Sequence, residues 1–435
     1  MPRIYGVCVS AFLIAVFVVL PILRLDGQSQ GLTAKEKQED IAILQDARDI
    51  LQKNYYDPTF HGLDMNALYA KYKAKVEASN SNHDAFAWIA AYVDSLNDSH
   101  TRFIPPPRVG QVQYGYELQM IGDRCFVVHL RPGFDAAAKL QVGDEVTALN
   151  GQAVTRSNFT LMQYYFYALA PVTESNFDLL DPKGVARHVQ VDSKVSMVAK
   201  QFTASDAVRN WITEDEEYQN GRDQYVENGD VIIWKLHQFF DDPFDVQQIF
   251  GRVRRHKTLI IDLRDDPGGV VDNLTEDMGY LFDHDFTVAE RSGRKKLKPM
   301  LVKTHHSYSF SGKLIVLVDS NSASCAEVLA RTVQLENRGT VIGDKSSGQV
   351  MESEGFAGER VEAGYGLYVT VADLTMKDGK SIEHVGVTPD ETMIPTAQDL
   401  ADGKDPVLAH AAQLAGWPLT PEQAGKLFPY KWTSL

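Results

Sequence analysis

The sequence predicts an α/β protein built from more than one unit, and three observations support this. Between about residues 201 and 395, short apolar runs alternate with helical segments, as expected for buried strands of a largely parallel sheet. Apolar residues spaced three and four apart over residues 34–51 predict amphipathic helices. Between these regions, residues 112–196 have the short strands and glycine turns of a small β-rich domain. A chain of 435 residues has room for two or three domains.

The composition narrows the class of partner. Apolar residues make up 44% and charged residues 23% of the chain, which is ordinary for globular protein. The formal net charge of -15 argues against a nucleic-acid partner, because binding phosphates requires a basic face. No histidine and cysteine cluster has zinc-ligand spacing, so we expect neither a metal nor a cofactor. Cys125 and Cys325 are expected to be small buried residues rather than a disulfide framework.

The N-terminus differs from the rest of the chain. Residues 7–23 are uncharged and lie between Arg3 and Arg24. The run is long for a signal-peptide core and short for a membrane-spanning helix. We expect residues 1–31 to be an export signal, with an uncleaved anchor as the alternative. Either interpretation places the protein outside the cytoplasm, periplasmic or extracellular, and any membrane contact would come only through this segment.

Residues 32–108 are predicted to form a helical subdomain. One amphipathic helix covers residues 34–51, and a second lies near residues 84–96. Three consecutive prolines at residues 105–107 stop regular structure, so we expect a domain boundary there.

The β-rich domain is expected over residues 110–197. Strands are predicted at residues 114–120 and 125–130, followed by a short helix at residues 136–140. A further strand ends in Asn150-Gly151, a sequence typical of a hairpin turn.

The α/β core is expected over residues 198–400, with residues 401–435 as a C-terminal extension. The predicted buried strands of the core are residues 231–236, 258–263, 314–318 and 340–342. The extension is expected to be helical, packing on the core or mediating assembly.

Ser324 is the candidate nucleophile. It lies where the strand at residues 314–318 passes through a short polar turn into a helix that begins on small residues. Unpaired backbone N–H groups and the helix dipole favour negative charge at such a point. The alternative is structural, because Ser324 and Glu327 also match a helix capping box.

Two further segments could complete a hydrolytic site. Pro267-Gly268-Gly269 follows the strand at residues 258–263, and backbone donors in such a turn suit an oxyanion. The alternative is an ordinary strand-to-helix turn. His100, in the pair Ser99-His100 that closes the helical region, could accept a proton at neutral pH. The alternative for this lone histidine is a surface or core position.

The motifs taken together resemble a known family. They are Arg264-x-x-Pro-Gly-Gly269, Ser322-Ala-Ser-Cys-Ala-Glu327, Val385-Gly-Val-Thr-Pro-Asp390, and the Gly143-Asp144…Asn150-Gly151 pattern of a PDZ domain. The set resembles the C-terminal-processing (tail-specific) serine peptidases and the related tricorn core. The resemblance implies a crotonase-like (ClpP-like) α/β catalytic core with an inserted PDZ-like domain. It also implies Ser324 as nucleophile, with oxyanion donors at Gly268 or Gly269 and at Cys325.

The same resemblance bears on the general base. Tail-specific members use a lysine 25 residues after the serine, and this chain has Gln349 there. Lys345 lies four residues too early and would need a shifted loop. Tricorn-like members use a histidine from a Ser-His pair and a later glutamate, which here correspond to Ser99, His100 and Glu383. Serine could orient the histidine, and Glu383 could act through a hydroxyl or water.

PDZ domains bind peptide ends by adding a strand to a sheet edge. Gly115 and Tyr116 fall where their carboxylate-binding loop lies, although a second glycine is missing. We therefore expect Gly115, Tyr116 and Gln349 to contact substrate.

The function expected from the sequence is an exported serine endopeptidase that acts on polypeptides. Two alternatives remain open: a catalytically silent peptide- or ligand-binding protein on the same scaffold, and a serine esterase or amidase. The sequence leaves the physiological substrate and the oligomeric state open.

Overall fold

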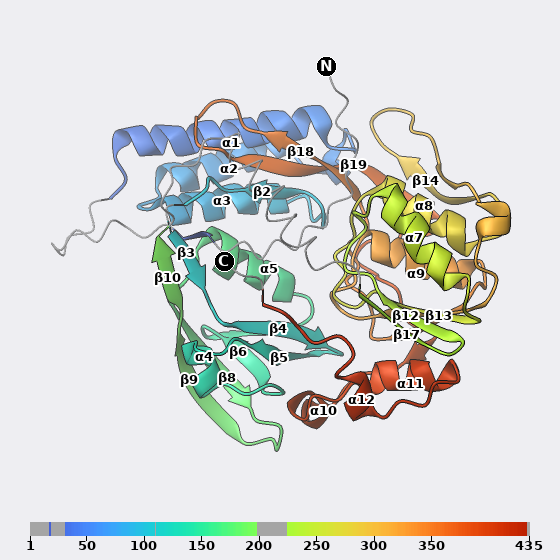
Figure 1. Ribbon diagram of the computed structural model, residues 1–435. Coiled ribbons are helices and arrows are strands. Elements are labelled where there is room, and N and C mark those ends of the chain that lie inside the picture. The colour runs from blue at the N-terminus through green and yellow to red at the C-terminus, as the bar shows by residue number, and fades with distance from the viewer. Residues whose placement is uncertain (1–16, 19–30, 109, 198–223, 433–435) are drawn as a thin grey trace.

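The computed structural model describes residues 17–18, 31–108, 110–197 and 224–432. The predicted export signal or anchor lies outside the described residues, apart from strand β1 (Phe17–Val18), which pairs with β3 (Gly110–Gln113). Within these ranges, no helix combines the length and the apolar character needed to cross a membrane. Figure 1 shows a helical layer, a β-rich region and an α/β core with helices at its C-terminal end.

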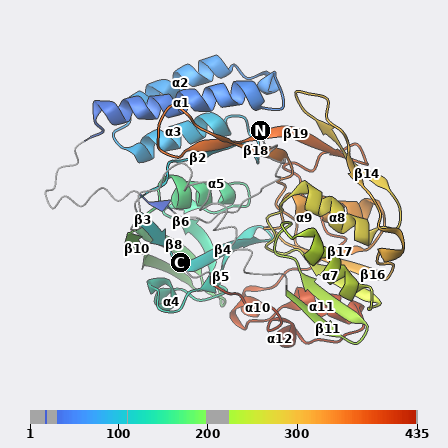
Figure 2. The ribbon, with the colours of Figure 1, turned by 45° about the horizontal axis from the view of Figure 1, so that its top comes forward.

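The predicted helices near the N-terminus are confirmed. They are α1 (Ala34–Asn54), α2 (Met65–Glu77) and α3 (Asn82–Asp94), with a short 3-10 turn η1 (Phe60–Gly62) after α1. Thr33 and Glu36 cap α1 reciprocally, and Ser81 caps α3. Apolar residues of α1 and α3, among them Leu44 and Ile89, share one buried cluster with Leu367 of a later strand. The helices therefore pack on a sheet far away in sequence, as Figure 2 shows.

The β-rich region contains a sheet in the order β4-β5-β6-β8-β9. Its strands are β4 (Tyr116–Ile121), β5 (Arg124–Leu130), β6 (Glu145–Leu149), β7 (Gln152–Ala153), β8 (Glu174–Leu180) and β9 (Ala186–Asp192). Strand β10 (Lys194–Met197) pairs with β3. Helices α4 (Asp135–Lys139), α5 (Phe159–Gln163) and the π-helical η2 (Tyr164–Leu169) complete the region. As predicted, Asn150 and Gly151 form the β6–β7 turn, with φ of 50° and 76°.

The core sheet has the order β11-β12-β13-β16-β17-β20. Its strands are β11 (Gln224–Asn228), β12 (Val231–Lys235), β13 (Thr258–Asp262), β16 (Lys313–Val318), β17 (Thr340–Gly343) and β20 (Glu391–Thr392). All neighbours are parallel except β11 and β12. The four predicted buried strands are therefore present, and their carboxyl ends share one edge, where α/β proteins place their sites.

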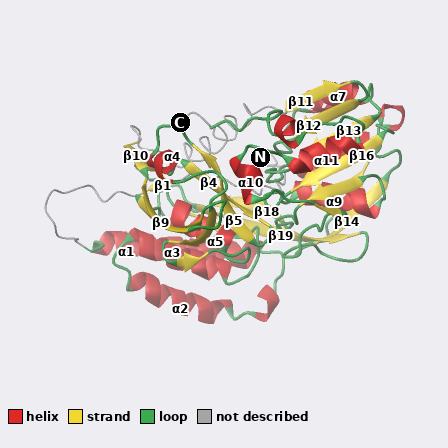
Figure 3. Ribbon diagram, turned by 90° about the horizontal axis from the view of Figure 1, so that it is seen from below, coloured by secondary structure: helices red, strands yellow, loops and turns green. Residues whose placement is uncertain are grey.

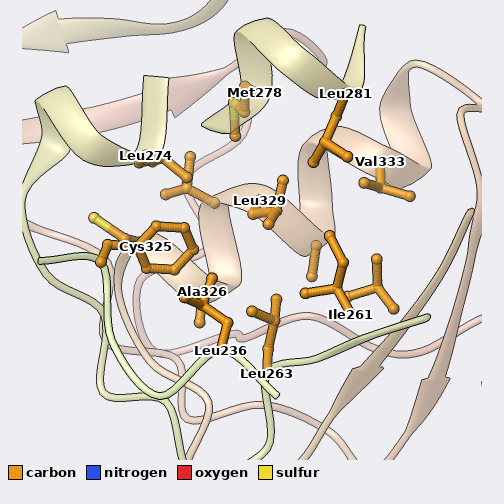
Figure 4. Close-up of a cluster of buried hydrophobic side chains, with 14 of the residues drawn as sticks. Leu236, Ile261, Leu263, Leu274, Met278, Leu281, Cys325, Ala326, Leu329 and Val333 are labelled. Carbon is orange, nitrogen blue, oxygen red and sulfur yellow. The ribbon is translucent and has the colours of Figure 1, made fainter. Parts of the chain in front are cut away.

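Helices cover both faces of this sheet. On one face lie α7 (Pro243–Val253), α8 (Val271–Leu281) and α9 (Cys325–Leu335). Figure 4 shows Leu274 and Met278 of α8, Leu329 of α9 and Ile261 of β13 in one buried cluster. On the other face lie α11 (Pro406–Leu414) and α12 (Pro421–Ala424), preceded by α10 (Ala397–Ala401). The residues after 401 thus include helices that pack on the core, one of the two roles expected for them.

A second, largely antiparallel sheet was not predicted. It has the order β15-β14-β19-β18, with β2 also paired to β19. Its strands are β2 (Arg102–Ile104), β14 (Phe286–Ser292), β15 (Met300–Val302), β18 (Glu352–Ala357) and β19 (Gly366–Met376), and the 3-10 turn η3 (His306–Tyr308) follows β15. The first half of β19 pairs with β2 and its last residues pair with β14. This strand therefore joins the helical layer to the core (Figure 3).

Candidate active site

Ser324 lies at a strained junction between a strand and a helix. Strand β16 ends at Val318, a polar turn follows, and α9 begins at Cys325. Ser324 is fully buried from solvent and has φ 55° and ψ -117°, a conformation that residues with a side chain rarely adopt. Such strain persists only where the surroundings impose it, and it is common at sharp turns that present a nucleophile.

Glu327 supplies much of that constraint. Its Oε2 accepts the N–H groups of Ser324 at 3.1 Å and Gln349 at 2.9 Å. Its Oε1 accepts the Ser346 hydroxyl at 2.5 Å and the Gly348 N–H at 2.7 Å. Burial raises the pKa of the Glu327 carboxyl to about 7, against the opposing effect of these donors. The helix-capping role expected for this residue extends to fixing the loop at residues 346–349 around Ser324.

The loop after β17 connects the serine to the second part of the site. The Gln349 carbonyl accepts the Ser324 N–H at 2.7 Å. The next N–H, that of Val350, is donated to Glu383 Oε2 at 2.9 Å. Ser324 and Glu383 are therefore held by the two sides of one peptide unit, the one between Gln349 and Val350.

Glu383, Ser99 and His100 form a continuous hydrogen-bonded chain. The Ser99 hydroxyl donates to Glu383 Oε2 at 2.9 Å and lies 2.7 Å from His100 Nδ1, while the Ser99 N–H donates to Glu383 Oε1 at 2.9 Å. A hydroxyl has one hydrogen, and here Glu383 takes it, so His100 Nδ1 must donate to Ser99 Oγ. The neutral ring then carries its lone pair on Nε2, which is the form a general base needs.

The backbone around His100 is fixed by contacts with β19. Asp98 Oδ1 accepts the N–H groups of His100 at 2.9 Å and Thr101 at 3.1 Å, and also the Thr370 hydroxyl at 2.6 Å. The Thr370 N–H donates to Thr101 Oγ1 at 3.0 Å. His100 is only 4% exposed. The pairing of β2 with β19 therefore places His100, which follows the helical layer in the chain, against the core.

The Pro-Gly-Gly turn lies directly against the serine. Gly268 has φ 101°, and a Cβ there would lie 2.6 Å from Ser324 Cβ and 3.0 Å from Cys325 N, so only glycine fits. The Gly268 N–H is donated to Asp266 Oδ1 at 2.7 Å. Within the part of the chain that the structure describes, the Gly269 N–H makes no hydrogen bond. Of the two glycines predicted as an oxyanion donor, Gly269 is therefore the one whose N–H is not already donated to a side chain.

The predicted substrate contacts have different surroundings. A Cβ on Gly115 would lie 2.4 Å from Phe134, and the Tyr116 side chain is buried among the apolar residues of the β-rich domain. Gly115 and Tyr116 thus make packing contacts within the β-rich domain, and their contact with substrate stays a prediction. The Gln349 backbone is part of the loop at residues 346–349 beside Ser324, and its side-chain amide donates a hydrogen bond to Ser347 Oγ.

Lys345 lies apart from the chain of Glu383, Ser99 and His100, whereas the neighbouring histidine His384 lies at its edge, with its Nε2 3.5 Å from Glu383 Oε1. Lys345 is exposed, and its backbone is tied to Asp344 and Arg156. His384 is half-exposed and its Nε2 lies 2.9 Å from the Asn97 carbonyl.

Sequence reasoning missed Asp98 and Asp266. Both immediately precede a segment that was singled out, and an Asp two residues before a backbone N–H is a recognised turn signal. Asp98 and Asp266 matter because they form hydrogen bonds with segments far away in the sequence, and a sequence pattern does not show such contacts.

Comparison with known proteins gives consistent matches. Residues 231–393 match the model of peptidase family S41, and residues 37–91 match that of the tricorn protease C1 domain. The chain is 22% identical over 393 residues to a carboxyl-terminal-processing protease of Synechocystis, covering 86% of this chain and 84% of that protein. It is 21% identical to a putative tricorn-like protease C-terminal subunit of Sulfurisphaera tokodaii, covering 86% of this chain and 43% of that protein.

Solved structures share the fold. Mature CPAF complexed with lactacystin has a TM-score of 0.64 at 15% identity, covering 85% of this chain and 96% of that one. The photosystem II D1 C-terminal processing protease has a TM-score of 0.52 at 19% identity, covering 83% of this chain and 94% of that one.

Proposed function

We propose that the chain is a member of peptidase family S41 that hydrolyses polypeptides, with Ser324 as nucleophile and His100 as general base. The observation that carries this assignment is the chain from Glu383 through Ser99 to His100. It fixes the ring in the tautomer that can accept a proton at Nε2. Lys345 is exposed outside this group, so a serine-lysine pair has no support here.

The proposed reaction follows from these roles. Ser324 Oγ attacks the scissile carbonyl while its proton passes to His100 Nε2. Glu383, acting through the Ser99 hydroxyl, stabilises the positive ring. His100 then gives the proton to the leaving amine, which departs as the acyl-enzyme forms. Water, deprotonated by His100, attacks the ester and releases the acid product and Ser324.

The proposed oxyanion donors are the N–H groups of Gly269 and Cys325. Cys325 is the first residue of α9, so its N–H lies at the positive end of the helix. A Cβ added to Gly268 would lie 3.0 Å from Cys325 N, so the Pro-Gly-Gly turn lies next to the Cys325 N–H. Donors fixed in this way act on charge that develops only in the transition state.

The β-rich region is proposed to be a PDZ-like domain inserted before a crotonase-like catalytic core. Strand β4 is an edge of its sheet, and an edge strand can pair with an extended peptide. A small cavity of about 40 Å³ lies where β4 and α5 meet the serine loop. Its lining includes Met120, Phe159, Ser346 and Ser347. A peptide bound along β4 would therefore lie beside the loop at residues 346–349, which adjoins Ser324. The apolar run at residues 7–23 supports export of the enzyme.

A fluorophosphonate probe, which phosphonylates an activated serine, tests the assignment. Labelling followed by peptide mapping is expected to place the adduct on Ser324. The adduct should disappear in Ser324→Ala and His100→Ala but persist in Lys345→Ala, the matched control for the other base. Loss in Lys345→Ala with retention in His100→Ala would reverse the choice of base. A folded wild-type chain without adduct would instead favour a binding protein on this scaffold.

The same samples identify the class of substrate. Rates on an activated ester, a small amide and an unfolded protein are compared for wild type and Ser324→Ala. A peptidase should cleave all three in a Ser324-dependent manner. Turnover of the ester alone would indicate an esterase.

A further inference from the structure

Asp266 is a buried acid that the proposed reaction does not use. It follows β13 by four residues and precedes Gly268 by two. Its exposed fraction is 0%, although it lies at the sheet edge that carries the site. Buried carboxyl groups are rare unless they are paired or held neutral, so its presence needs an explanation.

The contacts of Asp266 join the two halves of the proposed oxyanion site. Its Oδ1 accepts the Gly268 N–H at 2.7 Å, and its backbone carbonyl accepts the Ala323 N–H at 2.9 Å. One residue therefore fixes both the glycine turn and the residue before Ser324. Because Gly268 donates to Asp266, Gly269 is left as the turn's donor toward the serine.

The surroundings of Asp266 disfavour its ionised form. Its Oδ2 has no hydrogen-bond partner among the described residues. Lys235 of β12 is the facing cation, and it also donates to the Arg264 carbonyl and lies 3.7 Å from Asp262.

Acids outnumber that cation. Asp241 precedes α7 and Asp319 follows β16, and both act on Asp266 by like charge, while Asp277 on α8 is itself raised in pKa by burial first and then by acids that include Asp266. Burial first, and then Asp241 and Asp319, raise the pKa of Asp266 well above its usual range, against the opposing effects of the Gly268 N–H and Lys235.

We propose that Asp266 is a positioning residue that supports catalysis only while it is protonated. The neutral acid holds the Gly268 N–H and directs the Gly269 N–H toward the oxyanion. The ionised acid would place a second negative charge beside the oxyanion that develops at Ser324 and oppose it. The rate of acylation should therefore fall at alkaline pH. This inference rests on the proposed function of Ser324.

The test compares Asp266→Asn with wild type, using the full-length chain. Asparagine keeps the shape and the acceptor oxygen for Gly268 but cannot ionise. The readouts are the rate of fluorophosphonate labelling and kcat/KM on an activated ester, from about pH 6 to about pH 10. Wild type is expected to lose about ten-fold or more at the alkaline end, in line with the value of one oxyanion interaction. Asp266→Asn should keep its rate there, with the acidic side of the profile unchanged.

Two further variants separate charge from shape. Asp277→Asn removes another fully buried acid by the same change, away from the glycine turn, and should keep the alkaline loss. Asp266→Ala removes the acceptor for Gly268 and should lower the rate at every pH by about 10²-fold, the effect of a misplaced oxyanion donor. Circular dichroism confirms that each variant is folded.

The outcomes distinguish this inference from the proposed function. A wild-type chain that is not labelled overturns the proposed function and this inference with it. A labelled wild type overturns only the inference if its rate stays level to the alkaline end. The inference alone is also overturned if Asp266→Asn retains the alkaline loss or is slowed equally at every pH.

Discussion

The Ser324 junction and the His100 junction are held in place by different means. Glu327, which accepts the Ser324 N–H, lies three positions along the chain. Glu383, which accepts from Ser99, lies 284 positions away, and Thr370 lies 272 positions from Asp98. The Ser324 turn is thus shaped mainly within one strand-turn-helix unit and its adjoining loop, together with the Asp266 carbonyl that accepts the Ala323 N–H. The histidine acquires its setting only when the helical layer docks on the core.

The two buried groups are thus held largely by different contacts, although the peptide unit between Gln349 and Val350 bonds both Ser324 and Glu383. The serine turn follows from β16, α9 and the packing beneath them, which includes Cys325 and Ala326 (Figure 4). The His100 segment is set by the pairing of β2 with β19. A change that weakens this pairing should remove the base while leaving the strained serine intact. A substitution in one region should therefore leave the structure of the other region intact. A change in either region should nevertheless abolish catalysis.

The largest expected effect tests whether the two junctions act as one unit. His100→Ala should lower kcat by about 10⁴–10⁶-fold, and Ser324→Ala by a similar amount, because serine is a weak nucleophile without its base. The double variant should be no slower than either single one. Steady-state kinetics on an activated ester measure all three.

His384→Ala is the matched control for His100→Ala. His384 is a half-exposed histidine next to Glu383, so its removal should leave kcat within a few-fold of wild type, as expected for a surface change. If His384→Ala were as slow as His100→Ala, or if the double variant were much slower than both single ones, the assignment of one base would be wrong.

An intermediate effect on kcat is expected when the hydrogen-bonded chain from Glu383 to His100 is weakened but the histidine is kept. Glu383→Gln takes away the negative charge that stabilises the positive ring, and its amide group would face the N–H donors of Ser99 and Val350. We expect kcat to fall by about 10²–10³-fold, with KM little changed, since the interaction strengthens in the transition state. Labelling at Ser324 should slow in parallel.

Glu354→Gln makes the same change at an exposed position of β18 and should leave kcat unaltered. A Glu383→Gln variant with the kcat of wild type would mean that Ser99 alone orients the histidine.

The smallest expected effect concerns stability at the serine junction. Gly268→Ala should lower the free energy of unfolding by about 2–4 kcal/mol, because it adds backbone strain at φ 101° and a contact at 2.6 Å with Ser324. Gly184→Ala is a matched control: its φ is 82° and nothing lies within 4 Å of an added Cβ. That variant should lose only about 1–2 kcal/mol, the cost of strain alone. Urea unfolding measures both, and equal losses would show that the close approach to Ser324 does not matter.

Much of the fold could be predicted because its signals are local. The helix at residues 34–54, the Asn150-Gly151 turn and the four buried strands of the core sheet each follow from periodicity or turn chemistry. The second sheet could not be predicted in this way, since β2, β14 and β19 come from separate parts of the chain and pair only in three dimensions. The burial of Tyr116 likewise depends on packing within its domain rather than on its place in a motif.

The sequence by itself predicted the strand-turn-helix junction at Ser324, because a buried strand, a small polar turn and a capped helix are encoded within a few consecutive residues. It also supplied the candidates Ser99, His100 and Glu383 through their resemblance to a family pattern. The tertiary structure alone decided that the Ser99 hydroxyl connects His100 to Glu383 and that Asp266 takes the Gly268 N–H. Hydrogen bonds between residues far apart in the chain depend on which surfaces become buried together, and no local pattern records that.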